Sequence, residues 1–306
     1  MGKATDERIA APMYTYDKNQ LQSKLADYIG ARVPADAWQW LQEKATLVTK
    51  DSKQFHIAFA AASRKLGKQA VVLTAEEQTG LQQIRKQLTV TGWAIDRLCR
   101  VWLLLQLNSE DEDNYVQTIE RLFPAAEMNE LVALYSALPL LAYPQRWRAR
   151  CAEGIRNNIA DVLEAIMCDN PYPSEQLDEA AWNQLVLKAI FTEKPLQKVI
   201  GLIERSNETL ANSLTDYAHE RWAAHRKVLP LLWQCVGRFI NAHNFADIQR
   251  IALSTDARER EAAALACQQS TYAPAQELLK TNTLLQQLVN RGITWQEIAE
   301  KLQRNS

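Results

Sequence analysis

A chain of 306 residues with 47% hydrophobic and 23% charged side chains has the composition of an ordinary globular protein and is long enough to bury a sizeable core. Its 35 basic and 36 acidic side chains give a formal net charge of -1, so no overall field attracts nucleic acid or an anionic membrane. Only 9 glycines and 10 prolines occur, which disfavours a β-sandwich with many tight hairpins and favours long helices.

The N-terminus and the cysteines predict a cytoplasmic protein. Segment 1–20 contains no apolar run followed by a cleavage site, and no apolar run in the chain is long enough to span a bilayer. The dispersed cysteines form no CxxC pair, which favours a reducing compartment and thiols that pack as small buried side chains. They are Cys99, Cys151, Cys168, Cys235 and Cys267. We therefore expect no direct membrane insertion, and a disordered tail at residues 1–12.

Helix signals follow one another along the rest of the chain. Pro34 is typical of a first helical turn and predicts a helix to about Val48, and Ser52 begins another that ends near Gly67. Three capping boxes, in which a hydroxyl and a carboxylate bind free amides, predict further helix starts. They lie at 74–77, 109–112 and 294–297. The remaining prolines fall between periodic segments, giving roughly a dozen helices with short connections.

Segment 244–269 reads as one helical hairpin, because an amphipathic stretch, a polar turn and an alanine-rich stretch follow in order. Such a unit is typical of HEAT-like repeats, although no fixed period recurs elsewhere. The predicted fold is all-α, an irregular α-solenoid-like (HEAT-like) array of antiparallel helices. We expect a single domain at 13–306, made of N-terminal helices (13–140), a polar central region (141–240) and HEAT-like C-terminal helices (241–306).

The central region carries most of the candidate chemistry. Pro144 is expected to open one amphipathic helix whose apolar stripe runs from Ile155 to Ile166, with Arg150 and Glu153 spaced to form an ion pair. Its polar face is interpreted either as the wall of a groove or as an ordinary solvated face. The proline-rich turn at 169–173 either holds Tyr172 at a pocket rim or only stops one helix before the next.

The next segment, 178–191, is apolar nearly all round from Ala180 onward, which predicts a deeply buried helix. Buried polar side chains within it need partners. Asn183, Gln184 and Lys188 are these side chains. A lysine on such a helix either pairs with a carboxylate or faces a cavity, where it would contact an anion or a carbonyl.

Segment 212–222 has the highest density of polar side chains. Asn212, Asp216 and Glu220 recur every four residues and so share one helix face. This spacing partly matches the Asn/Ser/Glu magnesium site of class I terpene synthases, with the acidic run 110–113 as the nearest second motif. The chain has four histidines without metal-ligand spacing, and it contains no nucleophile elbow, Walker loop or dinucleotide fingerprint. No catalytic set, metal site or cofactor site is therefore predicted.

Three runs in this region resemble the EboA family. They are YPQRWRARCAEGIRNNIADVLEAIMCDNPYP, LDEAAWNQLVLKAIF and LTDYAHERWAAHRKVLPLLWQCVGRF, and the resemblance is strongest over 139–239. Candidate groove residues are the positions that match the family pattern. They are Arg146, Arg150, Glu153, Asn158, Tyr172, Asn183, Gln184, Lys188, Asp216, His219, Glu220, Arg221 and Trp222, and Asn170 matches as well. The run at 206–208 departs from the pattern, with Glu208 where a proline is expected.

The resemblance implies a role in metabolite traffic. EboA proteins are encoded in bacterial secondary-metabolite clusters, for example beside cyanobacterial sunscreen-pigment genes, and these clusters are linked to moving a precursor from cytoplasm to periplasm. The implied partners are other products of the ebo cluster, such as a UbiA-like membrane prenyltransferase, and a metabolite precursor. No catalytic residues and no cofactor follow from it.

Two functions are therefore expected. The first is a non-catalytic accessory protein that binds a precursor or a partner in a helical groove and supports its biosynthesis or trafficking. The alternative is an enzyme acting on an isoprenoid or other diphosphate-bearing intermediate at a Mg-dependent helical site, with Arg150, Lys188, Asp216 and Glu220 converging on the diphosphate. A nucleic-acid-binding module is disfavoured because the charge balance provides no basic stripe.

Overall fold

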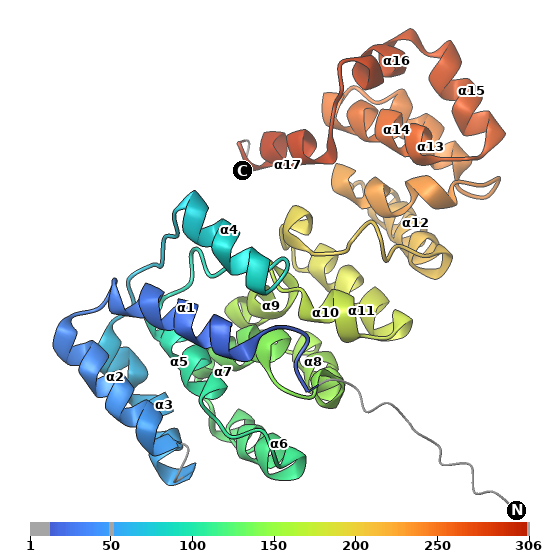
Figure 1. Cartoon of the computed structure of the whole chain (residues 1–306). Coiled ribbons are helices and arrows are strands. Elements are labelled where there is room, and N and C mark those ends of the chain that lie inside the picture. Colours follow the sequence, from blue (N-terminus) through green and yellow to red (C-terminus); the bar gives the residue numbers. More distant parts are fainter. Residues whose placement is uncertain (1–12, 49–51, 305–306) are drawn as a thin grey trace, which may run out of the picture. The chain divides into compact units, whose positions relative to one another are not determined.

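The computed structural model describes residues 13–48 and 52–304, and over these residues it is helical without β-strands (Figure 1). The predicted all-α class is confirmed. Seventeen α-helices are assigned there, more than the dozen expected, because several have only five to nine residues. The predicted tail at 1–12 lies outside the described residues. The described residues form two compact units that divide between Leu177 and Asp178, inside the polar central region.

The first unit is built around one buried helix. Helix α5 packs against α1, α3 and α7, so that ten of its eleven residues are buried. The buried Asp96 and Arg100 form an ion pair at 2.6 Å, which satisfies both charges within the core. The helices of this unit are α1 (Lys18–Gly30), α2 (Ala35–Val48), α3 (Ser52–Leu66), α4 (Ala75–Ile84), α5 (Ile95–Leu105), α6 (Glu112–Glu120), α7 (Met128–Ala137), α8 (Arg148–Ile155), α9 (Ala160–Met167) and α10 (Tyr172–Gln176).

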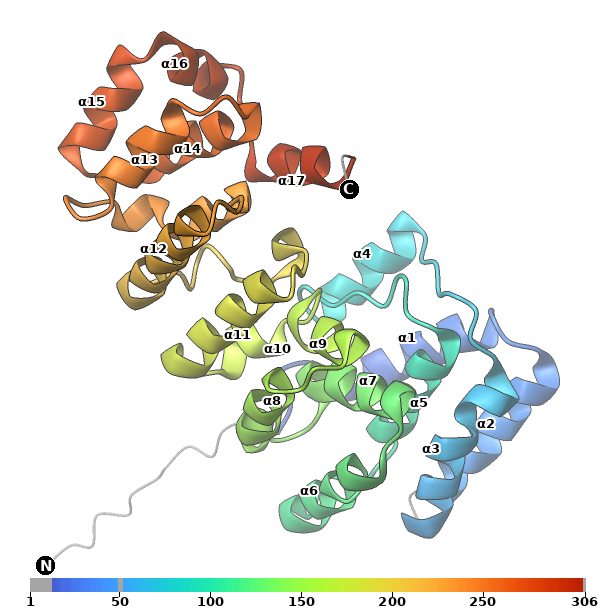
Figure 2. The same cartoon turned by 180° about the vertical axis from the view of Figure 1, so that it is seen from behind.

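The second unit is built around α14. This helix contacts α13, α15, α16 and α17 as well as the 3-10 segment Pro230–Cys235, and Figures 1 and 2 both show α13 and α14 side by side. The predicted hairpin at 244–269 is therefore confirmed as a packed helix pair. The helices of this unit are α11 (Glu179–Phe191), α12 (Glu208–Ala223), α13 (Phe245–Ala252), α14 (Ala257–Gln269), α15 (Ala273–Thr281), α16 (Thr283–Asn290) and α17 (Trp295–Gln303).

Local helix signals succeed where a capping side chain reaches a free amide within the first turn of its own helix. Thr74 and Glu77 form the predicted capping box at the start of α4, and Thr294 caps α17. The box predicted at 109–112 is wrong. Asp111 caps α6 instead, because its carboxylate accepts from the Asn114 amide at 3.0 Å and the helix begins at Glu112.

The single helix predicted after Pro144 is also wrong. A 3-10 turn at Pro144–Trp147 leads into α8, which ends at Ile155, and α9 begins only at Ala160. Asn157 explains the break, because its side-chain oxygen accepts from the Ile159 amide at 2.7 Å and so competes with helical hydrogen bonding. Ile159, expected in the apolar stripe, is consequently exposed.

Candidate functional site

Two first-unit candidates, Arg146 in the 3-10 turn Pro144–Trp147 and Arg150 in α8, form ion pairs with α6. Arg146 contacts Glu112 at 2.5 Å and Asp113 at 3.3 Å. Arg150 pairs with Glu120 and with Glu153, the latter at 2.6 Å as predicted, and its guanidinium lies 4.5 Å from the Phe123 ring centroid. The contacts to Glu112, Asp113 and Glu120 attach α8 and the 3-10 turn before it to α6, and all of these pairs occupy the arginines with protein carboxylates. Asn158 is exposed in the break between α8 and α9.

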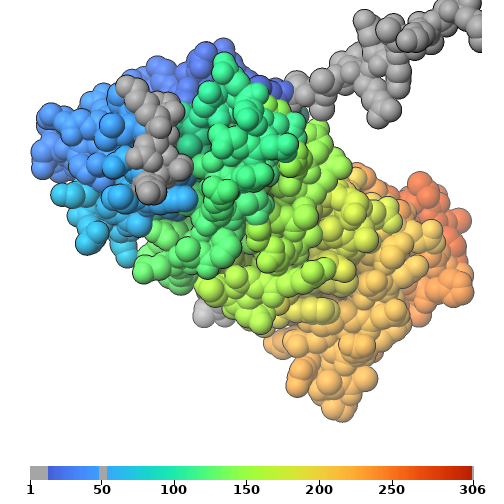
Figure 3. Space-filling view, turned by 90° about the horizontal axis from the view of Figure 1, so that it is seen from below, coloured from blue at the N-terminus to red at the C-terminus, as the bar shows by residue number. Residues whose placement is uncertain are grey.

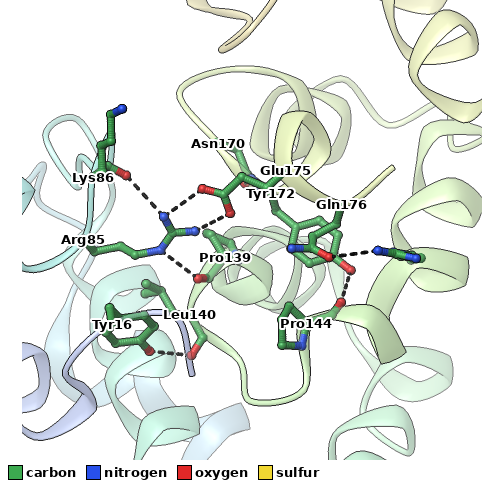
Figure 4. Close-up of polar contacts among 11 residues, drawn as sticks. Tyr16, Arg85, Lys86, Pro139, Leu140, Pro144, Asn170, Tyr172, Glu175 and Gln176 are labelled. Atoms are coloured by element: carbon green, nitrogen blue, oxygen red, sulfur yellow. Dashed lines mark hydrogen bonds and ion pairs between the residues drawn. The ribbon is translucent and has the colours of Figure 1, made fainter. Parts of the chain in front are cut away.

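Tyr172 lies in the interior of the first unit (Figure 4). Its side chain is fully buried, and its hydroxyl donates to the Pro144 carbonyl at 2.6 Å. Asn170 supports the turn, because its amide donates to the Ala165 carbonyl at 2.9 Å while its oxygen accepts from the Tyr172 amide. Of the two interpretations of this turn, the structure favours the structural one over a pocket rim.

Arg85 continues this polar network at the end of α4. Its guanidinium binds Glu175 through two hydrogen bonds of 2.8 and 2.6 Å and also donates to the Pro139 carbonyl at 3.1 Å (Figure 4). Beside it, Tyr16 donates to the Leu140 carbonyl at 2.6 Å. Because the Arg85 guanidinium and the Tyr16 and Tyr172 hydroxyls all meet protein partners, the network ties distant chain segments together and serves as structural support.

The polar residues of α11 have different environments. Asn183 is buried and exchanges two hydrogen bonds with Asn207, of 3.1 and 2.8 Å. Gln184 is exposed and Lys188 is half-buried, so the helix is less deeply enclosed than its apolar sequence predicts. Asn207 also caps α12 by accepting from the Leu210 amide. The Asn183–Asn207 pair therefore fixes the start of α12 relative to α11.

The acidic face of α12 points to solvent. Asn212, Asp216 and Glu220 are all exposed, and Figure 3 shows this helix at the surface in yellow and orange. Within residues 13–48 and 52–304, no group of three or more His, Cys, Asp or Glu side chains is arranged to hold a metal ion. The spacing of these three residues thus produces a solvated helix face.

The end of α12 has an unusual backbone. His225 adopts φ 54°, a left-handed conformation normally taken by glycine at this position. Its amide donates to the Trp222 carbonyl at 3.0 Å and the Arg226 amide donates to the Arg221 carbonyl at 2.8 Å, the pair of bonds that defines a Schellman cap. The Arg221 guanidinium secures the turn by donating to the Lys227 carbonyl at 3.0 Å. The cap projects three consecutive basic residues from the helix end.

An open groove of about 460 Å³ lies beside this cap, entirely within the second unit. It is bounded by the end of α12, the end of α13 and the turn that leads into α14. We call it the basic groove. Its lining residues are Trp222, His225, Arg226, Lys227, Arg250, Ser254, Thr255 and Glu259.

Aromatic packing orients one of these cations. The Arg250 guanidinium lies 4.2 Å from the Trp222 ring centroid, and Trp222 stacks on the buried Trp233 with centroids 5.9 Å apart. His219 lies 6.0 Å from Trp222 and contacts Asp247 at 2.8 Å. Three of the sequence candidates, Trp222, Arg221 and His219, thus line or support the groove from α12.

Sequence reasoning missed the other lining residues. The sequence shows a basic run at His225, Arg226 and Lys227 after a helix. It contains no glycine that would indicate the helix cap, and it does not show which segment packs beside the run. Arg250 and the hydroxyls of Ser254 and Thr255 come from a separate segment, and only the packing of α13 and α14 brings them to the end of α12.

The sequence profile described as "Metabolite traffic protein EboA" matches residues 21–237. The chain belongs to the EboA family. The profile covers the first unit from α1 onward and the part of the second unit that ends in the Pro230–Cys235 turn. No curated protein and no solved structure matches the chain. Across the described residues, no helix is both long and apolar enough to cross a bilayer.

Proposed function

We propose that this EboA-family chain is a non-catalytic accessory protein of metabolite traffic that binds an anionic secondary-metabolite precursor in the basic groove. Its family supports a role in traffic. One observation supports the ligand class: Arg226, Lys227 and Arg250 gather at one groove, and none of them forms an ion pair with a carboxylate among the described residues. Unpaired cations held around a concave surface attract an anion and orient it.

Binding without chemistry is the function that these groups support best. The groove contains cations, hydroxyls and one carboxylate, but no nucleophile placed beside a base. The sequence alternative, a Mg-dependent diphosphate enzyme, relies on Asp216 and Glu220, which are exposed, and on Arg150, which is occupied by Glu120 and Glu153. No observation favours it over binding.

Retention of a small molecule tests this proposal. The purified full chain is incubated with a cell extract of a bacterium that carries the cluster, separated by gel filtration and analysed by mass spectrometry. Wild-type protein is expected to retain an anionic molecule whose mass is the same as that of the molecule in the extract. The triple variant R226Q/K227Q/R250Q is expected to lose it.

The matched control is R238Q/K280Q/R304Q, which removes the same charge from exposed positions of the second unit outside the groove. Equal retention by both triple variants, or retention by neither the wild type nor the control, contradicts the proposal. Conversion of the retained molecule to a product of different mass supports the enzyme alternative instead.

The cellular partner is part of the same proposal. We expect a cytoplasmic chain that delivers its precursor to another product of the ebo cluster, such as the UbiA-like membrane prenyltransferase, and so supports movement toward the periplasm. Co-purification with tagged cluster proteins is expected to recover at least one of them, and recovery of none contradicts the delivery step while leaving the retention test to decide on binding.

A further inference from the structure

We propose that the basic groove is a phosphate-binding site, and that its ligand is a phosphomonoester or diphosphate of a small organic molecule. This inference rests on the proposed function, since it names the chemical class of the anion. It concerns Arg226, Lys227 and Arg250 together with the hydroxyls of Ser254 and Thr255.

Three cations without a carboxylate partner among the described residues, Arg226, Lys227 and Arg250, gather around one groove. Elsewhere in the described chain, arginines are repeatedly neutralised by nearby carboxylates within 3 Å. They are Arg32, Arg85, Arg100, Arg146, Arg150, Arg258 and Arg291. The groove cations lack such partners, although the net charge of the chain is -1 and acids are abundant. Leaving adjacent cations unpaired is unfavourable by mutual repulsion, unless an anion from outside occupies the space between them.

The charge count selects a dianion. Three permanent cations face one lining carboxylate, Glu259, which leaves a surplus of two permanent positive charges. The nearby Asp256 is already bound by Arg258 through contacts of 3.0 and 2.8 Å, so it does not cancel them. A phosphate monoester carries about 1.5 to 2 negative charges at pH 7, whereas a carboxylate carries one. A phosphate therefore neutralises nearly the whole surplus of positive charge in the groove, whereas a carboxylate neutralises only half of it.

The donor geometry also suits phosphate. The Arg250 guanidinium lies over the Trp222 ring, 4.2 Å from its centroid, and this contact restricts the side chain before a ligand arrives, so less conformational entropy is lost on binding. Ser254 Oγ accepts from the Asp256 amide at 3.1 Å, which leaves the Ser254 hydroxyl hydrogen to donate outward. Guanidinium, ammonium and hydroxyl donors around one space suit the three acceptor oxygens of a phosphate group.

The test compares two probes that share a ring and differ in their anion, phenyl phosphate and benzoate. Isothermal titration of the full chain at low salt is expected to show phenyl phosphate binding at least about tenfold more tightly than benzoate, because the phosphate carries more charge and one more acceptor oxygen, and one added charge-assisted hydrogen bond suffices for about a tenfold change in affinity. Arg250→Gln is expected to weaken phenyl phosphate by about tenfold or more on the same grounds. Arg250→Lys, which keeps the charge and loses the fork, is expected to fall between wild type and Arg250→Gln.

The matched control is Arg238→Gln, an exposed arginine of the same unit that does not line the groove, and it is expected to leave both affinities unchanged. Circular dichroism of each variant establishes that it is folded. Equal affinity for phenyl phosphate and benzoate overturns the assignment of the groove to phosphate. If Arg250→Gln weakens the binding of both probes, the groove is still an anion-binding site. Failure to bind either probe, or equal loss in Arg250→Gln and Arg238→Gln, also overturns the phosphate assignment, while the retention experiment decides separately on the proposed function.

A last arm separates a soluble phosphate from a lipid headgroup. Co-sedimentation uses phosphatidylcholine vesicles with and without phosphatidic acid. If the ligand is a small molecule, phenyl phosphate is expected to bind the protein without vesicles. It is also expected to displace the protein from any phosphatidic acid vesicles that it binds. Binding to phosphatidic acid vesicles alone, with no affinity for phenyl phosphate, overturns the small-molecule assignment.

Discussion

The Asn183–Asn207 pair offers the sharpest test of how α11 and α12 are held together. Both side chains donate and accept, at 3.1 and 2.8 Å, and Asn207 in addition caps α12 through the Leu210 amide at 2.9 Å. Truncating Asn183 removes the pair and leaves the cap. Truncating Asn207 removes both. The two single variants and the double variant therefore form a complete double-mutant cycle.

The expected energies follow from these contacts. Two net hydrogen bonds of about 1 kcal/mol each predict that Asn183→Ala lowers the free energy of unfolding by about 2 kcal/mol. Asn207→Ala also removes a cap that contributes about 1 kcal/mol, which brings its cost to about 3 kcal/mol. The double variant loses the pair only once and is expected to cost about 3 kcal/mol rather than about 5, a coupling energy of about 2 kcal/mol.

Urea unfolding of the full chain, followed by circular dichroism, measures these values. Asn282→Ala is the matched control, because Asn282 caps α16 at 3.2 Å in the same unit and has no contact with Asn183. Combined with Asn183→Ala, it should be additive. A coupling energy near zero for Asn183 and Asn207 would refute the reasoning, as would loss of ligand retention in Asn183→Ala with unchanged stability.

Three further outcomes are expected. Gly154→Ala places a Cβ 2.5 Å from the Tyr135 ring and should cost about 1–3 kcal/mol of unfolding free energy, measured in urea; an unchanged midpoint would contradict this packing. His225→Gly relieves a left-handed residue and should raise that free energy by about 1 kcal/mol in the same assay, whereas a decrease would show that the side chain stabilises the cap. A hydrogen bond from Arg258 holds the pKa of Asp256 below its ordinary value of 3.8, so the stabilisation is present above pH 3.8 and is lost as pH falls through the native pKa. Arg258→Gln should make stability fall less steeply with acid in a pH series of thermal unfolding, and an identical slope would count against the pairing.

Capping and proline signals in the sequence predicted those features of the fold that depend on only a few neighbouring residues. The capping box at Thr74 and the helix after Pro34 are both present, because each needs only hydrogen bonds or dihedral angles within one turn. The expectation that most cysteines are buried is confirmed for all five, which are free thiols. Burial raises the pKa of Cys151 to about 12, consistent with inert packing rather than reactivity.

Competing interactions explain the errors. Apolar periodicity carried the predicted helix through Asn157, but that side chain forms a local turn that periodicity does not register. The apolar run in 178–191 likewise predicted deep burial of this helix, whereas Gln184 is exposed and Lys188 is half-buried. How far a helix face is covered depends on neighbours that are distant in sequence, and one sequence does not contain that information.

The basic groove shows the same limit at the level of function. Trp222 and the run His225 to Lys227 lie inside the stretch that matches the EboA profile, but Arg250 and the residues up to Glu259 lie beyond its end at 237. The α12 side contributes the aromatic surface and two cations, whereas the α13–α14 side contributes the oriented guanidinium and the hydroxyls. Neither side alone surrounds an anion. A phosphate site at this groove therefore requires the helices after 237 to pack against the end of α12, so its specificity depends on residues that the family profile does not cover.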